Sequence, residues 1–279
     1  MEKLYQSMMN DRKKVLTIAG SDCSGGAGIQ ADLKTMTALG IYGMSAITAI
    51  TVQNTNGVIS SSEVDKDIVK AQIDAVCSDI MPDAVKIGML SSAEIIEAVS
   101  DKIKEYKLKN IVLDPVMIST SGRNLLEPEA IDVLKEKLIG HVSVITPNIP
   151  EAVALTGLNI EDDIDREKVA AVIGEKYGVC VLIKGGHSDN GADDMLYENK
   201  TGKISWLRGE KVETANSHGT GCTLSTAIAC GLADGKDMLR AVESAKKYLH
   251  GALAAGLDIG HGNGPVDHCY IIKNCFSSD

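Results

Sequence analysis

Short apolar runs rich in β-branched residues alternate along the chain with stretches whose apolar positions recur every three or four residues. The runs predict buried strands at residues 15–19, 45–52, 85–87, 111–113, 142–145 and 179–183. The periodic stretches predict helices at residues 29–39, 69–80 and 95–103. Repeated strand–helix–strand units with apolar strands are typical of a parallel sheet covered on both faces. The pattern therefore predicts an α/β fold of three layers around a mostly parallel central sheet.

The pattern changes after residue 190. Residues 194–198 and 203–207 flank a polar turn and predict a hairpin at the edge of the sheet. Two long periodic stretches, 220–234 and 238–256, predict the last two helices. The sequence contains no internal repeat, low-complexity segment or linker, so we expect the chain to form one domain.

The length of 279 residues suits a single large α/β domain. We place this domain at residues 15–268, after an N-terminal extension at 1–14 and before a C-terminal tail at 269–279. The extension lacks the apolar core of a secretory signal, and no apolar run reaches the roughly 18 residues that a membrane-spanning helix needs. We therefore expect a cytoplasmic protein without a membrane partner.

Charge and cysteine usage exclude further classes of protein. The 28 Lys and Arg against 38 Asp and Glu give a net charge of −10, whereas proteins that hold nucleic acid cluster Lys and Arg. The 7 cysteines are scattered and form no CxxC pair, so neither a zinc site nor a disulfide framework is indicated. We expect no nucleic-acid partner.

Function is expected in the loops after strands, because ligands bind beyond the carboxyl ends of the strands in open α/β sheets. The first such loop, residues 20–28, is rich in glycine. Residues 26–31 fit the G-x-G-x-x-A pattern of dinucleotide-binding proteins, but the second predicted strand ends without the acidic residue that would hold a ribose. The crowding of glycines favours close approach of the backbone to a small ligand over a simple tight turn.

A second loop, residues 216–222, opens the first of the two C-terminal helices. Consecutive backbone N–H groups at the start of that helix would form an anion hole. Cys222 lies in the first turn, where the helix dipole should lower the pKa of its thiol. The alternative is that Cys222 packs as a small apolar residue, but its position directly after Gly-Thr-Gly favours a functional role. His218 is compatible with a catalytic or a structural role.

Polar residues at strand ends predict a metal site. Asp114 follows one predicted strand, and Asn148 and Glu151 follow the next. Carboxylate and amide oxygens suit Mg²⁺, which binds through one or two carboxylates together with waters and phosphates. The alternative for Asn148 and Glu151 is capping of a helix start. Lys184, after the following strand, would place a cation near phosphates, or else form an exposed salt bridge.

Several motifs follow one another along the chain, namely AGSD (19–22), SGGAGIQADLK (24–34), VQNT (52–55), KIGML (86–90), LDPVM (113–117), NIPE (148–151), KGGH (184–187), HGTGCTLS (218–225) and GHGNGPV (260–266). Together they resemble the hydroxymethylpyrimidine/phosphomethylpyrimidine kinases of thiamine biosynthesis. The resemblance implies a ribokinase-like fold and a homodimer. It also implies ATP- and Mg²⁺-dependent phosphorylation of 4-amino-5-hydroxymethyl-2-methylpyrimidine to its monophosphate and then to the diphosphate.

The resemblance also implies a role for each site residue. Cys222 would take the hydroxyl proton, while Gly219, Thr220 and Gly221 would hold the transferring phosphoryl group. Asp114 and Glu151 would orient Mg²⁺ and its waters, and Asn148 and Lys184 would serve the nucleotide phosphates. The pyrimidine pocket would be lined by Gly20, Ala27, Asp32, Gln53, Met89 and Val116. The amide of Gln53 offers a donor and an acceptor to an aminopyrimidine edge. The polar segment 118–126 is expected to close over the phosphates as a lid.

Three alternatives compete with this interpretation. A pyridoxal kinase of the same superfamily can carry a second cysteine soon after the Val-Met pair, whereas residues 118–121 here are Ile-Ser-Thr-Ser. That difference favours the pyrimidine and leaves dual specificity open. A sugar kinase is disfavoured because the Gly-Ala-Gly-Asp ending of its usual anion hole is missing. A non-catalytic pyrimidine-binding regulator is disfavoured because it would need none of Cys222, Asp114 and Glu151.

Overall fold

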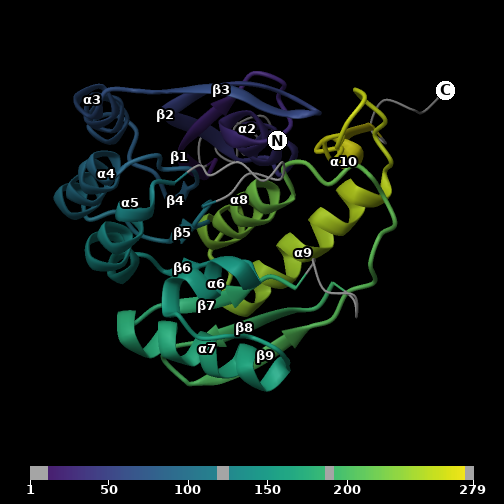
Figure 1. Cartoon of the computed structure of the whole chain (residues 1–279). Coiled ribbons are helices and arrows are strands. Elements are labelled where there is room, and N and C mark those ends of the chain that lie inside the picture. Colours follow the sequence, from purple (N-terminus) through teal and green to yellow (C-terminus); the bar gives the residue numbers. More distant parts are fainter. Residues whose placement is uncertain (1–11, 118–125, 186–191, 274–279) are drawn as a thin grey trace, which may run out of the picture.

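The computed structural model describes residues 12–117, 126–185 and 192–273 (Figure 1). Within these ranges the strands form one nine-stranded sheet in the order β3-β2-β1-β4-β5-β6-β7-β8-β9. The strands are β1 (Lys14–Asp22), β2 (Tyr42–Asn54), β3 (Gly57–Glu63), β4 (Ala84–Ile87), β5 (Ile111–Leu113), β6 (Val144–Ile145), β7 (Cys180–Ile183), β8 (Asp194–Glu198) and β9 (Lys203–Leu207). The helices are α2 (Gly28–Ala38), α3 (Lys66–Cys77), α4 (Ala93–Tyr106), α5 (Pro128–Val133), α6 (Ile149–Thr156), α7 (Asp163–Tyr177), α8 (Thr220–Ala233), α9 (Met238–Ala254) and α10 (Tyr270–Lys273).

The strands from β2 to β7, taken in sheet order, run parallel. β3 pairs antiparallel with β2, and β8 and β9 continue antiparallel from β7. The structure therefore confirms the mostly parallel sheet and the hairpin predicted at residues 194–207. Because parallel strands point the same way, the loops that follow β1, β4, β5, β6 and β7 meet at one edge of the sheet.

Helices cover both faces of the sheet and give the predicted three layers (Figure 1). α3, α4, α5 and α7 pack on one face, toward which Leu16 and Ile18 of β1 point. α2, α8 and α9 pack on the other face, toward which Val15 points. The same alternation recurs in β5 and β7. Strands buried on both faces need apolar residues at successive positions, which explains the unbroken apolar runs in the sequence.

The hydrophobic pattern misses several parts of the fold, α6 and α10 among them. β3 contains three consecutive serines, and most of its residues are exposed, so it carries no apolar run. α7 begins with a charged stretch and buries few apolar side chains. α5 and the π-helical and 3₁₀ turns after it (Leu134–Leu138 and Ile139–His141) were likewise not predicted. Residues 118–125 of the expected lid lie outside the described residues.

Side chains cap the first turns of five of the described helices. The caps of α3, α4, α6, α7 and α9 are Asp65, Ser92, Asn148, Asp162 and Asp237. α2 and α8, in contrast, begin at Ala27 and Gly219 without a side-chain cap. No capping side chain therefore accepts from their first backbone N–H groups. Both helix starts lie at the edge of the sheet where ligands bind.

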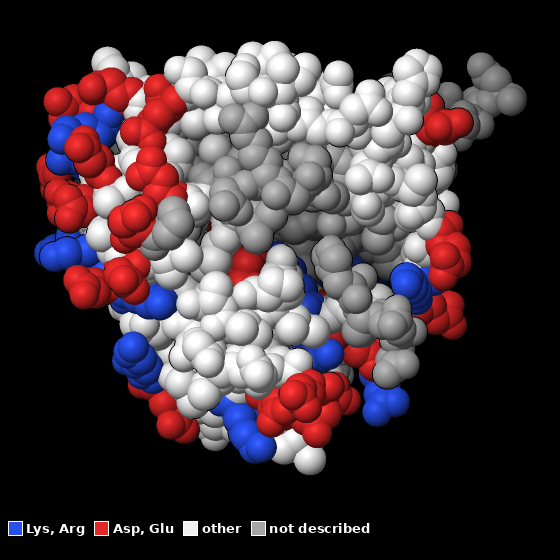
Figure 2. Space-filling model, in the orientation of Figure 1, with Lys and Arg blue, Asp and Glu red and all other residues white. Residues whose placement is uncertain are grey.

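The surface view shows acidic side chains gathered over α3 and α4 (Figure 2), where Glu94, Glu97 and Asp101 are exposed. The cluster agrees with the net charge of −10. None of the described helices is long and apolar enough to cross a membrane.

The chain after α9 folds back onto α8 and α9. His268 is buried, and its Nε2 lies 3.0 Å from Thr223 Oγ1. The Thr223 hydroxyl donates its hydrogen to Gly219 O at 2.8 Å, so His268 Nε2 must carry a proton and donate to Thr223. Tyr248 of α9 donates to His268 O, and its ring packs 5.6 Å from that of Tyr270. Residues 267–273 thus anchor the first turn of α8.

Acidification should destabilise the protein through His268. Burial, with a smaller effect of the Lys34 charge, lowers the pKa of His268 to about 4, against 6.5 in the unfolded chain. Between these values the unfolded chain binds a proton that the folded chain does not bind. The contribution is therefore complete above about pH 6.5 and falls by about 3 kcal/mol as the pH drops to 4.

Urea unfolding at a series of pH values measures this loss. The control His268→Gln keeps an N–H donor for Thr223 but cannot titrate, so its stability should vary less across the same window. Equal pH dependence in the two proteins would contradict the prediction.

Candidate active site

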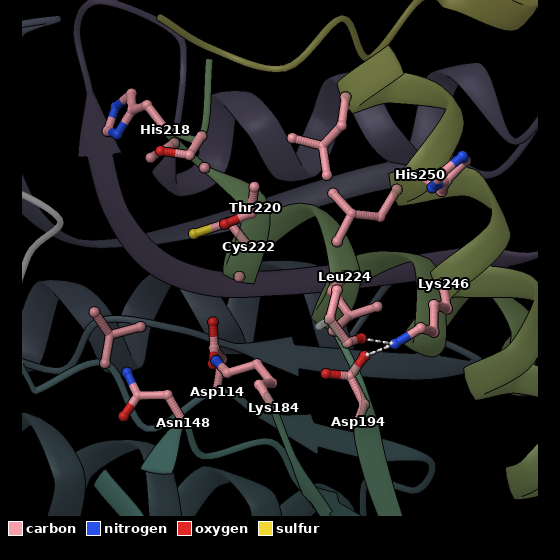
Figure 3. Close-up of a pocket in the computed structure, with 18 of the residues that line it drawn as sticks. Asp114, Asn148, Lys184, Asp194, His218, Thr220, Cys222, Leu224, Lys246 and His250 are labelled. Atoms are coloured by element: carbon pink, nitrogen blue, oxygen red, sulfur yellow. Dashed lines mark hydrogen bonds and ion pairs between the residues drawn. The ribbon is translucent and has the colours of Figure 1, made fainter. Parts of the chain in front are cut away.

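A cavity of about 1400 Å³ opens at the edge of the sheet where the parallel strands end. Figure 3 shows Thr220 and Cys222, from the start of α8, on one side of it. Asp114, Asn148 and Lys184, which follow three neighbouring strands, lie on the facing side. The topology thus brings together residues that lie more than 100 positions apart in the sequence.

The start of α8 has no side-chain cap and lines the cavity. Gly219 has φ 83°, and a Cβ there would lie 1.9 Å from Gly26 O, so glycine is required at this position. A Cβ at Gly221 would lie 3.1 Å from Asp114 Oδ2 and 3.5 Å from Lys184 Nζ. The uncapped helix start therefore faces the carboxylate and the ammonium directly, across a gap of a few ångströms.

Cys222 lies beside this helix start, but its environment differs from the prediction. Burial raises the pKa of the Cys222 thiol, and the nearby Lys86 charge and the backbone N–H of Gly28 lower it by less. The predicted fall in pKa is therefore wrong for the protein without ligands. A helix dipole acts on any cysteine in a first turn, but here removal of the sulfur from water outweighs it.

A buried ion pair lies beneath the cavity. Lys86 of β4 donates to both carboxylate oxygens of Asp32 on α2, at 3.0 and 2.8 Å, and both side chains are fully buried. Thr17 and Thr226 donate to the same carboxylate at 2.6 and 2.8 Å. Burial alone would lower the pKa of Lys86, but the Asp32 charge raises it above its usual value.

Asp32 therefore does not line the pyrimidine pocket, which corrects that prediction. Its four hydrogen bonds point into the protein, and Lys86 takes its place at the cavity wall. Lys86 was not predicted, although a lysine in the middle of the apolar run Val85-Lys86-Ile87 was a visible signal.

The facing wall carries the two predicted metal-binding carboxylates. Lys184 Nζ lies 2.7 Å from Asp114 Oδ1 and 4.0 Å from Glu151 Oε2. Burial raises the pKa of Glu151 more than Lys184 lowers it. The described residues contain no cluster of three or more His, Cys, Asp or Glu side chains that would hold a metal by itself. Two adjacent carboxylates do fit Mg²⁺, which completes its shell with waters and phosphates.

Asn148 and Glu151 cap the start of α6. The Asn148 side chain accepts from Glu151 N, and the Glu151 carboxylate accepts from Asn148 N, both at 2.8 Å. The capping alternative considered for this pair is thus confirmed. Both side chains also line the cavity, so the capping box fixes their orientation there.

The remaining predicted pocket residues line the same cavity. They are Gly20, Ala27, Gln53, Met89 and Val116. The glycine-rich loop beside them is organised by Asp22, whose carboxylate accepts from the backbone N–H groups of residues 24, 26 and 27. Hydrogen bonds from His218 and Ser24 outweigh burial and lower the pKa of Asp22 to about 2.

The glycines of this loop also serve internal packing. A Cβ at Gly28 would lie 2.4 Å from Gly20 O. The close approach that the sequence predicted toward a ligand is therefore, at Gly28, an approach to the chain itself.

The far end of the cavity was not predicted at all. Its wall includes an ion pair between Lys246 and Asp194 at 2.7 Å, with His250 nearby (Figure 3). Trp206 also lines it and donates from Nε1 to Glu167 at 2.8 Å, while Arg166 stacks 5.1 Å above its ring. These residues come from the edge hairpin, α7 and α9, where spacing in the sequence carries no motif.

A profile of the family described as phosphomethylpyrimidine kinase matches residues 22–267. This chain belongs to the phosphomethylpyrimidine kinase family. The hydroxymethylpyrimidine/phosphomethylpyrimidine kinase of Rhizobium meliloti (strain 1021) is 49% identical over 257 residues, which cover 91% of this chain and 96% of the relative. Family and fold agree with the resemblance noted in the sequence.

Two solved structures extend the comparison. A phosphomethylpyrimidine kinase from Clostridium difficile 630 is 48% identical, with a TM-score of 0.77 over 86% of this chain and 98% of that chain. The pyridoxal kinase from Staphylococcus aureus in complex with AMP-PCP and pyridoxal is 35% identical, with a TM-score of 0.84 over 93% of this chain and 94% of that chain. As a member of a kinase family, this chain is a phosphotransferase, and the family implies ATP as its co-substrate.

Removing Asp32 should destabilise the protein strongly. Asp32→Asn leaves the Lys86 charge buried without a counter-charge, which costs about 3–5 kcal/mol. The double variant Asp32→Asn/Lys86→Met removes both charges and should recover part of the loss. Urea unfolding at pH 7 measures both. A single variant as stable as the unsubstituted protein would show that the pair is not needed for folding.

Proposed function

We propose that this kinase transfers the γ-phosphoryl group of ATP to 4-amino-5-hydroxymethyl-2-methylpyrimidine and then phosphorylates the monophosphate to the diphosphate, in thiamine biosynthesis. One observation carries the proposal. The uncapped start of α8, with Cys222 in its first turn, faces the Asp114–Lys184 pair across a cavity whose other wall holds Gln53. Family membership supports the same assignment.

Phosphoryl transfer asks mainly for positioning and neutralisation of charge. The N–H groups at residues 219–221 would hold the transferring group, and Lys184 would leave Asp114 to meet phosphate oxygens. Asp114 and Glu151 would hold Mg²⁺, which supplies positive charge to the phosphates when it is bound. Asn148 would keep Glu151 oriented and face the nucleotide itself.

Cys222 would act as the base in this reaction. Its thiolate takes the proton of the hydroxymethyl group while the freed oxygen bonds to the γ-phosphorus and ADP leaves. Two groups favour the thiolate, namely the Lys86 ammonium and the Gly28 N–H at the start of α2. Both belong to elements that the buried Asp32–Lys86 pair holds together.

A pyridoxal kinase, or a kinase of dual specificity, is the second candidate. The similarity to the Staphylococcus aureus pyridoxal kinase favours it. Both substrates are flat nitrogen rings with a hydroxymethyl group, so the anion hole and the base would serve either. Discrimination would depend on the groups around Gln53.

We also propose that residues 15–268 form the kinase domain of a cytoplasmic homodimer. Thr51 and Gln53 of β2 face the cavity, whereas Ile50 and Val52 alternate with them and are 54% and 50% exposed. This apolar outer face at the sheet edge suits a second copy of the chain. The net charge of −10 argues against a nucleic-acid partner.

Mass spectrometry of the products tests the function. Purified protein is incubated with Mg-ATP and, separately, with the pyrimidine alcohol, its monophosphate and pyridoxal. We expect mono- and diphosphorylated pyrimidine, little pyridoxal phosphate, and no product after addition of a chelator. Pyridoxal phosphate as the main product would favour the second candidate, and no product from any substrate would refute both.

Replacing Cys222 should slow the reaction without weakening substrate binding. Loss of a general base costs about 10²–10⁴-fold in kcat, and we expect this for Cys222→Ala and for Cys222→Ser, whose hydroxyl is far less acidic. The matched control is Cys269→Ala, which removes an exposed thiol. Steady-state kinetics and calorimetric binding of the pyrimidine measure the two effects. A Cys222→Ala enzyme with normal turnover would exclude Cys222 as the base.

A further inference from the structure

The side chain of His218, in the loop before α8, contacts Asp22 of the glycine-rich loop and Gln53 at the cavity wall. Its Nε2 lies 3.0 Å from Asp22 Oδ2 and 2.9 Å from the carboxamide of Gln53. His218 and Asp22 are both buried, and Gln53 is partly buried at the cavity wall. One ring nitrogen therefore meets two polar partners, and only one hydrogen or one lone pair can lie between them.

The Asp22 carboxylate determines whether His218 Nε2 carries a hydrogen or a lone pair. Asp22 already accepts from three backbone N–H groups and from the Ser24 hydroxyl, so it is an ionised acceptor. A lone pair on His218 Nε2 would face this carboxylate at 3.0 Å and be repelled. Nε2 therefore carries a hydrogen directed at Asp22, and the end of the Gln53 amide beside it must be the oxygen.

The other end of the same amide gives an independent answer. Thr51 Oγ1 lies 3.4 Å from it and donates its single hydrogen to Ser21 O at 2.9 Å. Thr51 can therefore only accept from Gln53, which places the amide NH₂ group at this end. Rotation of the carboxamide by 180° exchanges its oxygen and its nitrogen without moving the other atoms. His218 and Thr51 both require the orientation in which the oxygen faces His218 and the NH₂ group faces Thr51.

We propose that His218, held by Asp22, is a specificity-determining positioning residue that fixes the Gln53 carboxamide with its oxygen toward His218 and its NH₂ toward Thr51. The inference rests on the proposed function for the identity of the ligand. Each end of the amide keeps one unused group, an oxygen lone pair and a hydrogen, that faces a ligand.

This orientation selects one edge of a pyrimidine. His218 and Cys222 belong to one loop, so the accepting oxygen lies on the side of the reacting hydroxymethyl group. In 4-amino-5-hydroxymethyl-2-methylpyrimidine the 4-amino donor is next to that group, and the ring N3 acceptor is one position further. The fixed amide therefore matches the 4-amino ring. The 4-oxo analogue presents an acceptor and then an N3–H donor, and it is rejected because like groups face each other.

The first test uses the unsubstituted protein without ligands. Long-range ¹H–¹⁵N correlation of the histidine rings reports whether His218 Nε2 carries a hydrogen, with His218→Gln identifying the signal. We expect a protonated Nε2. An unprotonated Nε2 would overturn the inference, whatever reaction the protein catalyses.

The second test compares binding of the 4-amino and 4-oxo pyrimidines by calorimetry in three variants. In His218→Ala only the 3.4 Å contact with Thr51 still orients the amide, so the preference for the 4-amino compound should fall about tenfold or more. His218→Gln supplies two N–H groups, one for Asp22 and one for Gln53, and should retain the preference within about threefold. The control His261→Ala removes an exposed histidine of a neighbouring loop and should behave like the unsubstituted protein.

Turnover separates positioning from a general loss of structure. With saturating 4-amino substrate, kcat of His218→Ala should stay within about threefold while KM rises. An unchanged preference in His218→Ala, or an equal loss in His218→Gln, would overturn the inference. If His218→Ala does not fold, the inference is tested by the binding preference of His218→Gln and by the hydrogen on His218 Nε2 in the unsubstituted protein. Selective binding without any phosphoryl transfer would instead refute the proposed function and leave the assignment of His218 standing.

Discussion

The buried pair of Lys86 and Asp32 connects the elements on which the site depends. Together with Thr17 and Thr226 it ties β1, α2, β4 and α8 to one another in the interior. A charge pair without solvent needs hydrogen bonds to its polar atoms, and Asp32 accepts four of them from Lys86, Thr17 and Thr226. Because Asp32 of α2 is hydrogen-bonded both to Lys86 of β4 and to Thr226 of α8, the starts of α2 and α8 are fixed relative to each other at the cavity.

The two uncapped helix starts have different tasks. In the proposed function the start of α8 holds an anion, whereas the backbone N–H of Gly28 at the start of α2 lowers the pKa of the Cys222 thiol. Burial raises the energy of the thiolate, and the two helix starts and the Lys86 charge partly offset that cost. Because its environment stabilises the Cys222 thiolate only in part, the thiolate binds a proton strongly. It would therefore be an effective base toward the hydroxymethyl group of a bound substrate.

The sequence was informative where a pattern is local. Apolar runs predicted the parallel strands. The order of the motifs predicted the family, and all of the predicted site residues except Asp32 line the cavity. It was uninformative where the deciding partner is distant. Asp32 falls on the apolar stripe of its helix, between Ile29 and Met36, but the lysine that buries it lies 54 positions away. The same limit applies to Cys222, because the dipole of its own helix is visible in the sequence and the burial of its sulfur is not.

A single tryptophan at the far wall of the cavity gives the protein an intrinsic fluorescent probe of that site. Trp206 is the only tryptophan among the 279 residues, and the Glu167 carboxylate and the Arg166 guanidinium hold its ring in one orientation. Indole emission depends on the polarity and the charges around the ring. The chain therefore has a single intrinsic fluorophore at the cavity, with no other indole signal to obscure it. Its emission can follow the arrival and departure of a ligand at that end in real time, without a label.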